Sequence, residues 1–123
     1  MNQLFIPPEL AQVAREKGFD EECLGYFKAR RGKILFRLVG EAAAHRNSER
    51  LTISAPLYQQ IIQWLFSRGI YLEDSWISTD QVWICDLRDR SGNLIWEDST
   101  DNKSLMIQDA WNRAIARALH FLP

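Results

Sequence analysis

The densest cluster of charge in this sequence is a basic segment, residues 28–37, next to the aromatic residues Tyr26 and Phe27. It holds five of the 15 basic residues: Lys28, Arg30, Arg31, Lys33 and Arg37. Cationic side chains bind phosphates and aromatic rings stack on bases, so the pattern is typical of a nucleic-acid contact. The same charges also occur where they only solvate a hairpin and protect an edge strand from aggregation. The sequence therefore gives a candidate polyanion contact at Arg30, Arg31, Lys33 and Arg37.

A second cluster is acidic and lies within residues 86–101; its members are Asp86, Asp89, Glu97, Asp98 and Asp101. Converging carboxylates can bind Mg²⁺ or Ca²⁺, or divide acid and base roles between them. The spacing does not match a Ca²⁺ loop, and Arg88 and Arg90 lie among the acids, which favours surface ion pairs. A small metal-dependent enzyme that uses these carboxylates is an alternative function, and no residue is assigned as catalytic, metal-binding or cofactor-binding.

Few side chains are suited to nucleophilic catalysis. Cys23 and Cys85 stand 62 positions apart without a CxxC pattern, so we expect neither a disulfide nor a zinc site, but two small apolar side chains in strands. His120 lies in the last turn of an expected helix, where the helix dipole favours a cation. His45 lies in residues 41–50, whose structure the sequence leaves open. We expect a non-enzymatic protein without a cofactor.

The leading hypothesis rests on an apolar surface. Residues 57–66 carry a wide apolar face at helical spacing, and five tryptophans are many for 123 residues. A thin sheet of short strands would not cover that face, and exposed aromatic surface marks interaction sites. We therefore expect a protein-interaction or assembly module, with a homodimer as the concrete form. The expected interface residues are Tyr58, Ile62, Trp64 and Phe66.

In the first half of the chain, the elements that position these groups are predicted from the spacing of apolar residues and from the prolines and glycines that bound them. Pro7-Pro8 and Gly18 bound a helix over 9–17. Apolar and β-branched residues over 23–27 and 34–39 predict a hairpin around a turn at 28–33. A short strand over 51–53 is followed by Ser54 as the N-cap of a helix that ends near Arg68, before Gly69.

In the second half, residues 81–87 and 94–96 predict another hairpin, with Trp83 and Trp96 as a cross-strand pair. Ser104 opens a last helix, whose apolar residues recur every three or four positions to Leu122. The order α-β-β-α-β-β-α predicts an α+β fold. We expect one small antiparallel sheet of about four strands, with the second and third helices on one face and the first helix at an edge.

Composition restricts the class of protein. With 46% hydrophobic and 25% charged residues, residues 1–123 are expected to form a single globular domain. The net charge of -1 argues against a protein that coats nucleic acid or membrane by charge alone. Residues 1–8 carry no basic leader and break their apolar run at two prolines, so we expect a cytoplasmic protein without a membrane segment.

Two segments also carry a resemblance. Residues 18–27, GFDEECLGYF, and residues 53–60, ISAPLYQQ, followed by Trp64, resemble a family of short uncharacterised bacterial and prophage-encoded proteins. The family pattern is a GFDE.C.GY segment, an APLYQQ helix, a tryptophan-containing hairpin and a closing amphipathic helix. The resemblance implies an α+β protein carried by a mobile element, and it brings no activity or ligand. The basic turn at residues 30–33 and the segment 41–50 depart from that pattern.

Overall fold

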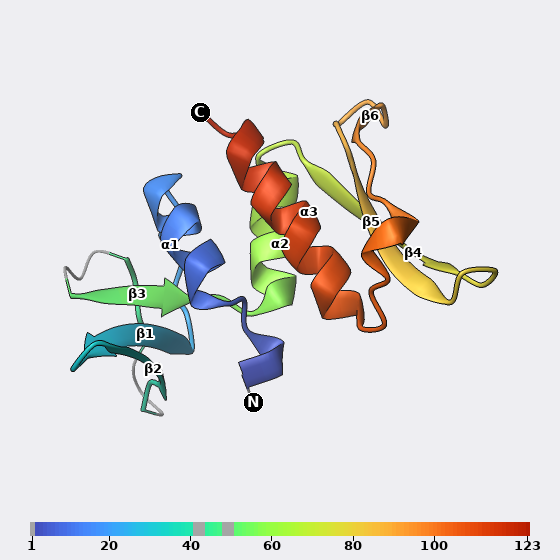
Figure 1. Cartoon of the computed structure of the whole chain (residues 1–123). Helices are drawn as coiled ribbons and strands as arrows, with labels where there is room; N and C mark the ends of the chain where they lie inside the picture. Colours follow the sequence, from blue (N-terminus) through green and yellow to red (C-terminus); the bar gives the residue numbers. More distant parts are fainter. Residues whose placement is uncertain (1, 41–43, 48–50) are drawn as a thin grey trace. The chain divides into compact units, whose positions relative to one another are not determined.

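A computed structural model describes residues 2–40, 44–47 and 51–123 of the chain. Within these ranges it has three α-helices and two antiparallel sheets of three strands each, so the predicted α+β class is confirmed. The chain divides into two compact units, Met1–Ile61 and Ile62–Pro123. Each unit contains one sheet (Figure 1). The prediction of one domain over 1–123 stays a prediction.

The first unit combines a short helix with the first sheet. After a 3₁₀ turn at Asn2–Leu4 come α1 (Pro8–Glu16), β1 (Gly25–Arg30), β2 (Lys33–Leu38) and β3 (Thr52–Ala55). The strand order is β2-β1-β3, with both pairs antiparallel, and α1 contacts β3. The buried apolar side chains include Phe5, Ile6, Ala11, Ala14, Phe19 and Phe27. These side chains form the core beneath one face of the sheet.

The second unit places the last helix on the second sheet. Its elements are the remainder of α2 (Tyr58–Ser67), then β4 (Tyr71–Ile77), β5 (Val82–Arg88), β6 (Leu94–Trp96), a 3₁₀ turn at Thr100–Asn102 and α3 (Ile107–Phe121). The strand order is β4-β5-β6, and α3 packs on β5 and β4. Buried side chains of α3, Ala110, Ala114, Ile115, Ala118 and Leu119, follow the predicted helical spacing.

Glycine ends the first two helices, as predicted. Gly18 and Gly69 have φ of 95° and 90°, a left-handed conformation that disfavours other residues. The residue after each glycine donates its backbone N–H to the preceding helix, from Phe19 to Ala14 and from Ile70 to Leu65, at 2.9 and 3.0 Å. These hydrogen bonds, from the residue after the glycine back to the last turn of the helix, satisfy carbonyl groups that a helix end otherwise leaves unpaired.

Several sequence predictions about strands need correction. The sheet of about four strands is two sheets, and β4, the long partner of β5, was not predicted. Trp83 therefore faces Trp76, with ring centroids 5.5 Å apart, while Trp96 pairs with Leu87. β4 was not predicted because residues 71–77 are mixed in polarity: its exposed and half-buried residues include Glu73 and Asp74 as well as apolar ones.

Two predicted helix caps are also wrong. Ser54 lies within β3 and is fully buried, and α2 begins at Tyr58. Ser104 is buried and bridges to Trp83 of β5, and the N-cap of α3 is Met106. Both serines precede an apolar helical stretch, which is the usual pattern of an N-cap, but backbone pairing with a neighbouring strand takes them into a sheet.

On the side of β5 that faces away from β4, groups other than a strand satisfy the backbone where β6 does not reach. The backbone N–H of Trp83 donates to the carbonyl of Ser104 at 2.8 Å, and the N–H of Cys85 donates to a carboxylate oxygen of Asp98 at 3.0 Å. β6 pairs further along, opposite Leu87. The two strand orders, β2-β1-β3 and β4-β5-β6, show that the predicted joining of the two hairpins into one sheet does not occur.

The described helices include none that is both long enough and apolar enough to cross a membrane.

Candidate nucleic-acid interface

The β1–β2 hairpin places the predicted polyanion residues on a single face of the first sheet. Register pairs Tyr26 with Arg37, Lys28 with Leu35 and Arg30 with Lys33. Directly paired residues, and residues two apart on one strand, point to the same side of a sheet. Lys28, Arg30, Lys33 and Arg37 therefore share one side, and Arg31 lies in the turn between the strands. We call these five residues the basic face.

The turn that holds the tip of this hairpin has two residues. Arg31 and Gly32 have φ of 52° and 74°. Two positive φ angles between paired residues define a type I′ turn, whose twist matches that of the flanking strands. The turn is shorter than the predicted turn over 28–33, because Lys28, Arg30 and Lys33 belong to the strands themselves. Strand pairing up to the turn fixes the spacing of the cations.

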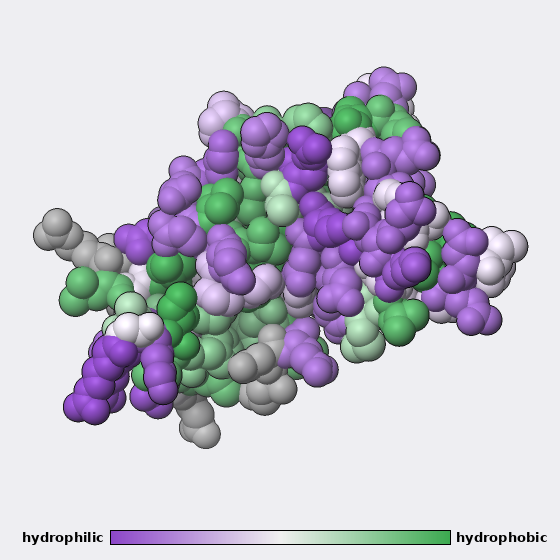
Figure 2. Space-filling model, in the orientation of Figure 1, coloured by the Kyte–Doolittle hydropathy of each residue, from purple (hydrophilic) through white to green (hydrophobic). Residues whose placement is uncertain are grey.

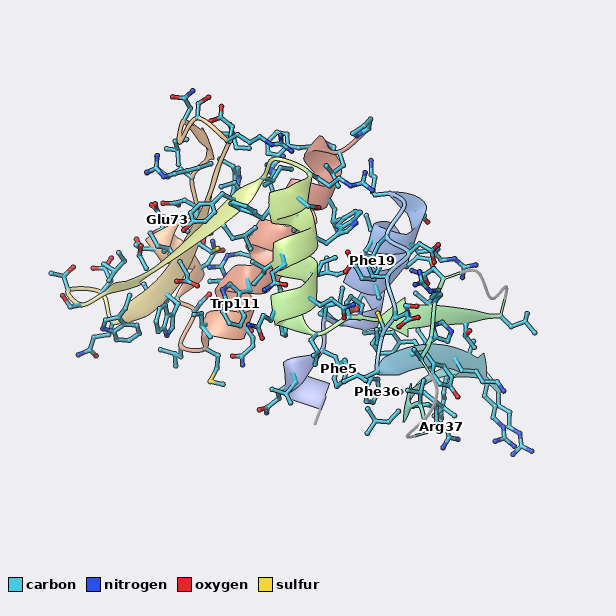
Figure 3. All side chains as sticks on the ribbon, turned by 180° about the vertical axis from the view of Figure 1, so that it is seen from behind. Phe5, Phe19, Phe36, Arg37, Glu73 and Trp111 are labelled. Atoms are coloured by element: carbon cyan, nitrogen blue, oxygen red, sulfur yellow. The ribbon has the colours of Figure 1, made fainter. Side chains whose placement is uncertain are left out.

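A close approach between the strands explains a glycine at the other end of the hairpin. A Cβ atom on Gly25 would lie 2.7 Å from the ring of Phe36. Phe36 itself contacts Phe5 and Phe27, with ring centroids 4.8 and 5.7 Å apart, on the side opposite the basic face. Figure 3 shows Phe5 and Phe36 next to each other at this position. The apolar side of the hairpin is thus packed around Phe36, whereas Ile34 and Leu38 on the same side are 62% and 48% exposed.

All five residues of the basic face are exposed. Strands β1, β2 and β3 contain no Asp or Glu. The ion pairs seen among the described residues are Arg46 with Glu22, Arg88 with Glu73 and Arg113 with Asp98, and none involves the basic face. Hydrophilic side chains project at the turn end of the hairpin in Figure 2. Within residues 2–40, 44–47 and 51–123, no carboxylate pairs with the positive charge of this face.

A buried polar cluster supports the other end of the same face. The ring of Tyr26 stacks on His45, with centroids 4.9 Å apart and planes at 14°. The two ring nitrogens of His45 lie 2.6 Å from Ser54 Oγ and 2.5 Å from Thr52 Oγ1. His45 also exchanges backbone hydrogen bonds with Cys23. Because His45, Thr52 and Ser54 are all buried, we interpret the cluster as structural. His45, for which the sequence predicted no structure, thus belongs to this buried cluster.

The predicted protein interface is only partly at the surface. Tyr58 and Trp64 are buried, with 7% and 5% of their surface exposed, and Ile62 is half-buried. Phe66 alone is largely exposed, at 61%. The prediction that these four side chains share one exposed face is therefore corrected: along one helix, large apolar residues at core positions and at the surface cannot be separated by residue type alone.

Phe66 lines a pocket within the second unit. The pocket has a volume of about 530 Å³, and Tyr71, Arg88 and Arg90 also line it. The rings of Phe66 and Tyr71 meet edge to face, with centroids 5.8 Å apart. The N–H groups of Arg90 reach the carbonyl of Ser67 at 3.0 Å, while Arg88 pairs with Glu73 at 3.1 Å. This pocket could not be predicted from the sequence, because its lining residues come from two segments, 66–71 and 88–92, that meet only when β4 pairs with β5.

The acidic cluster over 86–101 is built into the second sheet. Asp98 accepts hydrogen bonds from Arg113 at 2.8 and 3.0 Å and from the Cys85 N–H, and its own N–H donates to Asp86 at 2.9 Å. Arg113 also binds Ser104. Burial raises the pKa of Asp98, but the hydrogen bonds from Arg113 and from backbone N–H groups outweigh it and hold that pKa below its usual value.

The side chain of Asp89 stabilises the turn that follows it. Its carboxylate accepts hydrogen bonds from the backbone N–H groups of Asn93 and Ser91, both at 2.9 Å. These hydrogen bonds lower the pKa of Asp89, and the one from Asn93 contributes most. Across the described part of the chain, no three His, Cys, Asp or Glu side chains are grouped to hold a metal ion. Of the five candidate carboxylates, Asp86, Asp89 and Asp98 instead stabilise the β5–β6 region, while Glu97 and Asp101 are exposed.

Both cysteines are free thiols in the structure. Cys85 lies in β5, as predicted for a strand, while Cys23 lies just before β1 in an isolated bridge to His45. Burial raises the pKa of Cys23 to about 11 and that of Cys85 to about 12. Neither thiol is suited to act as a nucleophile at neutral pH.

Comparisons of this chain with protein-family models, with curated proteins and with solved structures found no match.

Proposed function

We propose that this protein binds nucleic acid through the basic face of its first unit. The observation that carries this proposal is that five exposed cations, fixed by strand pairing and a two-residue turn, have no carboxylate partner in the part of the chain that the structure describes. Phosphate groups bind such arrays with release of counterions. Nucleic-acid binding was the alternative function predicted from the sequence. We prefer it to the predicted apolar interface because Tyr58 and Trp64 are buried.

The competing explanation for these charged residues is that they protect an edge strand from aggregation. One or two charges on β2 are enough to prevent edge-to-edge aggregation. Here Lys28 lies on β1 between Leu35 of β2 and Thr52 of β3, where no edge needs protection. The cations therefore extend beyond what that explanation requires.

The test is a salt titration of binding, followed by fluorescence anisotropy of labelled DNA and RNA. The double variant R30Q/K33Q removes two phosphate contacts, so the slope of log K against log salt should become less steep by about 1.8 for duplex DNA. The control R68Q/K103Q changes the net charge equally, at exposed positions of the second unit, and should leave the slope unchanged. Absence of binding at about 50 mM salt, or equal effects of both variants, would contradict the proposal.

An anionic membrane is a second polyanion that the same charges could meet. Vesicles with phosphatidylserine, added as competitor to the labelled DNA, separate the two. Five cations would gain about 5 kcal/mol from an anionic lipid surface, at about 1 kcal/mol each, so the vesicles are a real competitor. The proposal predicts that they displace the labelled DNA less well than the same DNA unlabelled. Binding to the vesicles with none to DNA or RNA would overturn it.

A second candidate function is protein association through the surface around Phe66. Phe66 and Tyr71 are 61% and 47% exposed and contact each other beside the pocket, and aromatic residues are enriched at interfaces. We expect a dimer at about 100 μM by light scattering, lost in F66S and kept in F121S, which changes another exposed phenylalanine of the second unit. A monomeric mass at that concentration contradicts this candidate.

We also propose that the protein acts in the cytoplasm, without enzymatic activity. Two buried free thiols are typical of a reducing compartment. Membership of the family of short bacterial and prophage-encoded proteins stays a proposal that rests on the two sequence segments alone.

A further inference from the structure

We infer that the nucleic acid bound by the basic face is a B-form DNA duplex, and that the tip of the β1–β2 hairpin enters its major groove. The inference rests on the proposed function and names its ligand. We define the tip as residues 29–34. Among the described residues, β3 pairs with β1 as far as Lys28, opposite Thr52, and the preceding Leu51 is 86% exposed. The tip therefore extends beyond the described part of β3 as a ribbon of two strands. Three of its six residues are cations: Arg30, Arg31 and Lys33.

The dimensions of the tip fit a major groove. Neighbouring strands lie about 4.8 Å apart, and each residue of a strand advances about 3.3 Å. With three residues on each side, residues 29–31 and 32–34, the ribbon therefore projects about 10 Å beyond β3. The major groove of B-DNA is about 12 Å wide and about 8.5 Å deep, and it admits a two-stranded β-ribbon. The minor groove is about 6 Å wide, so a ribbon enters it only where the duplex is deformed.

The remaining cations are placed to meet the groove walls. Lys28 and Arg37 lie further from the turn, on the same side of the sheet as Arg30 and Lys33. Arg37 is four residues from Lys33 along β2, which corresponds to about 13 Å. Figure 3 labels Arg37 at the base of the hairpin, away from the extended nitrogen-tipped side chains. When the tip is inserted, these two side chains would contact phosphates that flank the groove.

The basic face lacks what single strands require. Proteins that bind single strands stack bases on exposed aromatic rings. On the described part of this face the aromatic ring is that of Tyr26, which is half-buried and has one side covered by His45. The other two aromatic residues of the hairpin, Phe27 and Phe36, lie on the opposite side. A single strand would gain phosphate contacts without stacking, and so bind more weakly.

Duplex RNA is excluded by groove shape. The major groove of an A-form helix is deep and narrow, and side chains cannot read it. A ribbon of two strands is wider than a side chain, so the tip has no entry there. DNA and RNA of one sequence and length therefore form a sensitive comparison.

The experiment is a competition by fluorescence anisotropy with the full chain. The probe is a labelled DNA duplex of about two helical turns; the competitors are the same duplex unlabelled, each of its single strands, and an RNA duplex of the same sequence. We expect the DNA duplex to compete about tenfold better than the others, with a salt slope near -4.5 for five phosphate contacts. Methyl green, which occupies the major groove, should displace the protein, and netropsin, which occupies the minor groove, should not.

The variant R31N isolates the tip. Asparagine tolerates the positive φ of this turn position, so the hairpin is kept while one cation is lost. Its salt slope for duplex DNA should be about 0.9 less steep than that of the unmodified chain. Equal competition by single strands or by RNA, or displacement by netropsin alone, overturns the inference and leaves the proposed function standing. Failure to bind any of the nucleic acids overturns both.

Discussion

The substitution D98N would test whether one buried carboxylate closes the edge of the second sheet. Asp98 accepts from the N–H of Cys85 and twice from Arg113, and its side chain has no exposed surface. The amide introduced by D98N keeps the shape of the carboxylate but removes its charge. It also turns an N–H group toward at least one of these donors. Arg113 would lose its charged partner and keep its hydrogen bond to Ser104.

The magnitude follows from burial and bond count. Removing one partner of a buried ion pair costs about 3–5 kcal/mol of unfolding free energy, because the other charge stays without compensation. The Arg113 side chain is 25% exposed, so water recovers part of that cost and the lower limit applies. We therefore expect D98N to destabilise the second unit by about 3 kcal/mol. That is a large share of a total stability of about 5–15 kcal/mol.

Urea unfolding followed by tryptophan fluorescence is the suitable assay. All five tryptophans, from Trp64 to Trp111, lie in the second unit, so the signal reports that unit alone. The control D101N changes a neighbouring exposed carboxylate and should alter the free energy by less than about 0.5 kcal/mol. The folded-state pKa of Asp98 is below the usual 3.8, so its contribution is full above that pH and is lost as pH falls through the lower value. The difference between D98N and the unmodified protein should therefore shrink below about pH 4.

Two results would refute this reasoning. One is a change below about 1 kcal/mol at pH 7, which would mean that the carboxylate adds little to the edge of β5. The other is a penalty that is as large at pH 3 as at pH 7, which would mean that packing and not charge is lost.

Three further predictions concern the first unit and the thiols. G25A should destabilise the first unit by about 1–3 kcal/mol, measured by unfolding followed with far-UV circular dichroism, because a Cβ would lie 2.7 Å from the packed Phe36 ring. G40A, whose Cβ would have no atom within 4 Å, should be neutral. Equal stability of the two variants contradicts the close approach. H45A removes a stacked ring and two hydrogen bonds and should cost about 2–4 kcal/mol by the same measurement, and a cost below about 1 kcal/mol would show that the cluster is not structural. With pKa values of about 11 and 12, Cys23 and Cys85 should react with a disulfide reagent at pH 8 only after denaturation; rapid reaction of either in the native protein would disprove their burial.

Helices and their ends were the part of the fold that the sequence predicted best. α1, α2 and α3 lie where apolar residues recur at three and four positions, and Gly18 and Gly69 end the first two. These signals are local: the period of a helix and the φ of a glycine need no distant partner. The first hairpin was predicted for the same reason, since its turn and both strands lie within residues 25–38.

Strand partners could not be predicted in this way. β4 was missed, β5 was paired only with β6, and one sheet was expected where there are two. Pairing depends on which edges are free, and the edge of β5 is closed by Ser104 and by the side chain of Asp98, residues remote from it in sequence. Ser54 and Ser104 were taken for helix caps because the local pattern of a cap is the same whether or not a strand lies alongside.

For function, the sequence by itself determined which charges the protein carries and that five of them fall within ten residues. Only the tertiary structure decided what those charges can do. Strand register placed four of them on one side of a hairpin, where no described carboxylate pairs with them, and put Arg31 in the turn. Burial removed Tyr58 and Trp64 from the surface, and Asp98 hydrogen-bonds to the backbone of β5. The physical reason is that composition and period depend on near neighbours in the chain, whereas exposure and pairing depend on residues that meet only when the chain is folded.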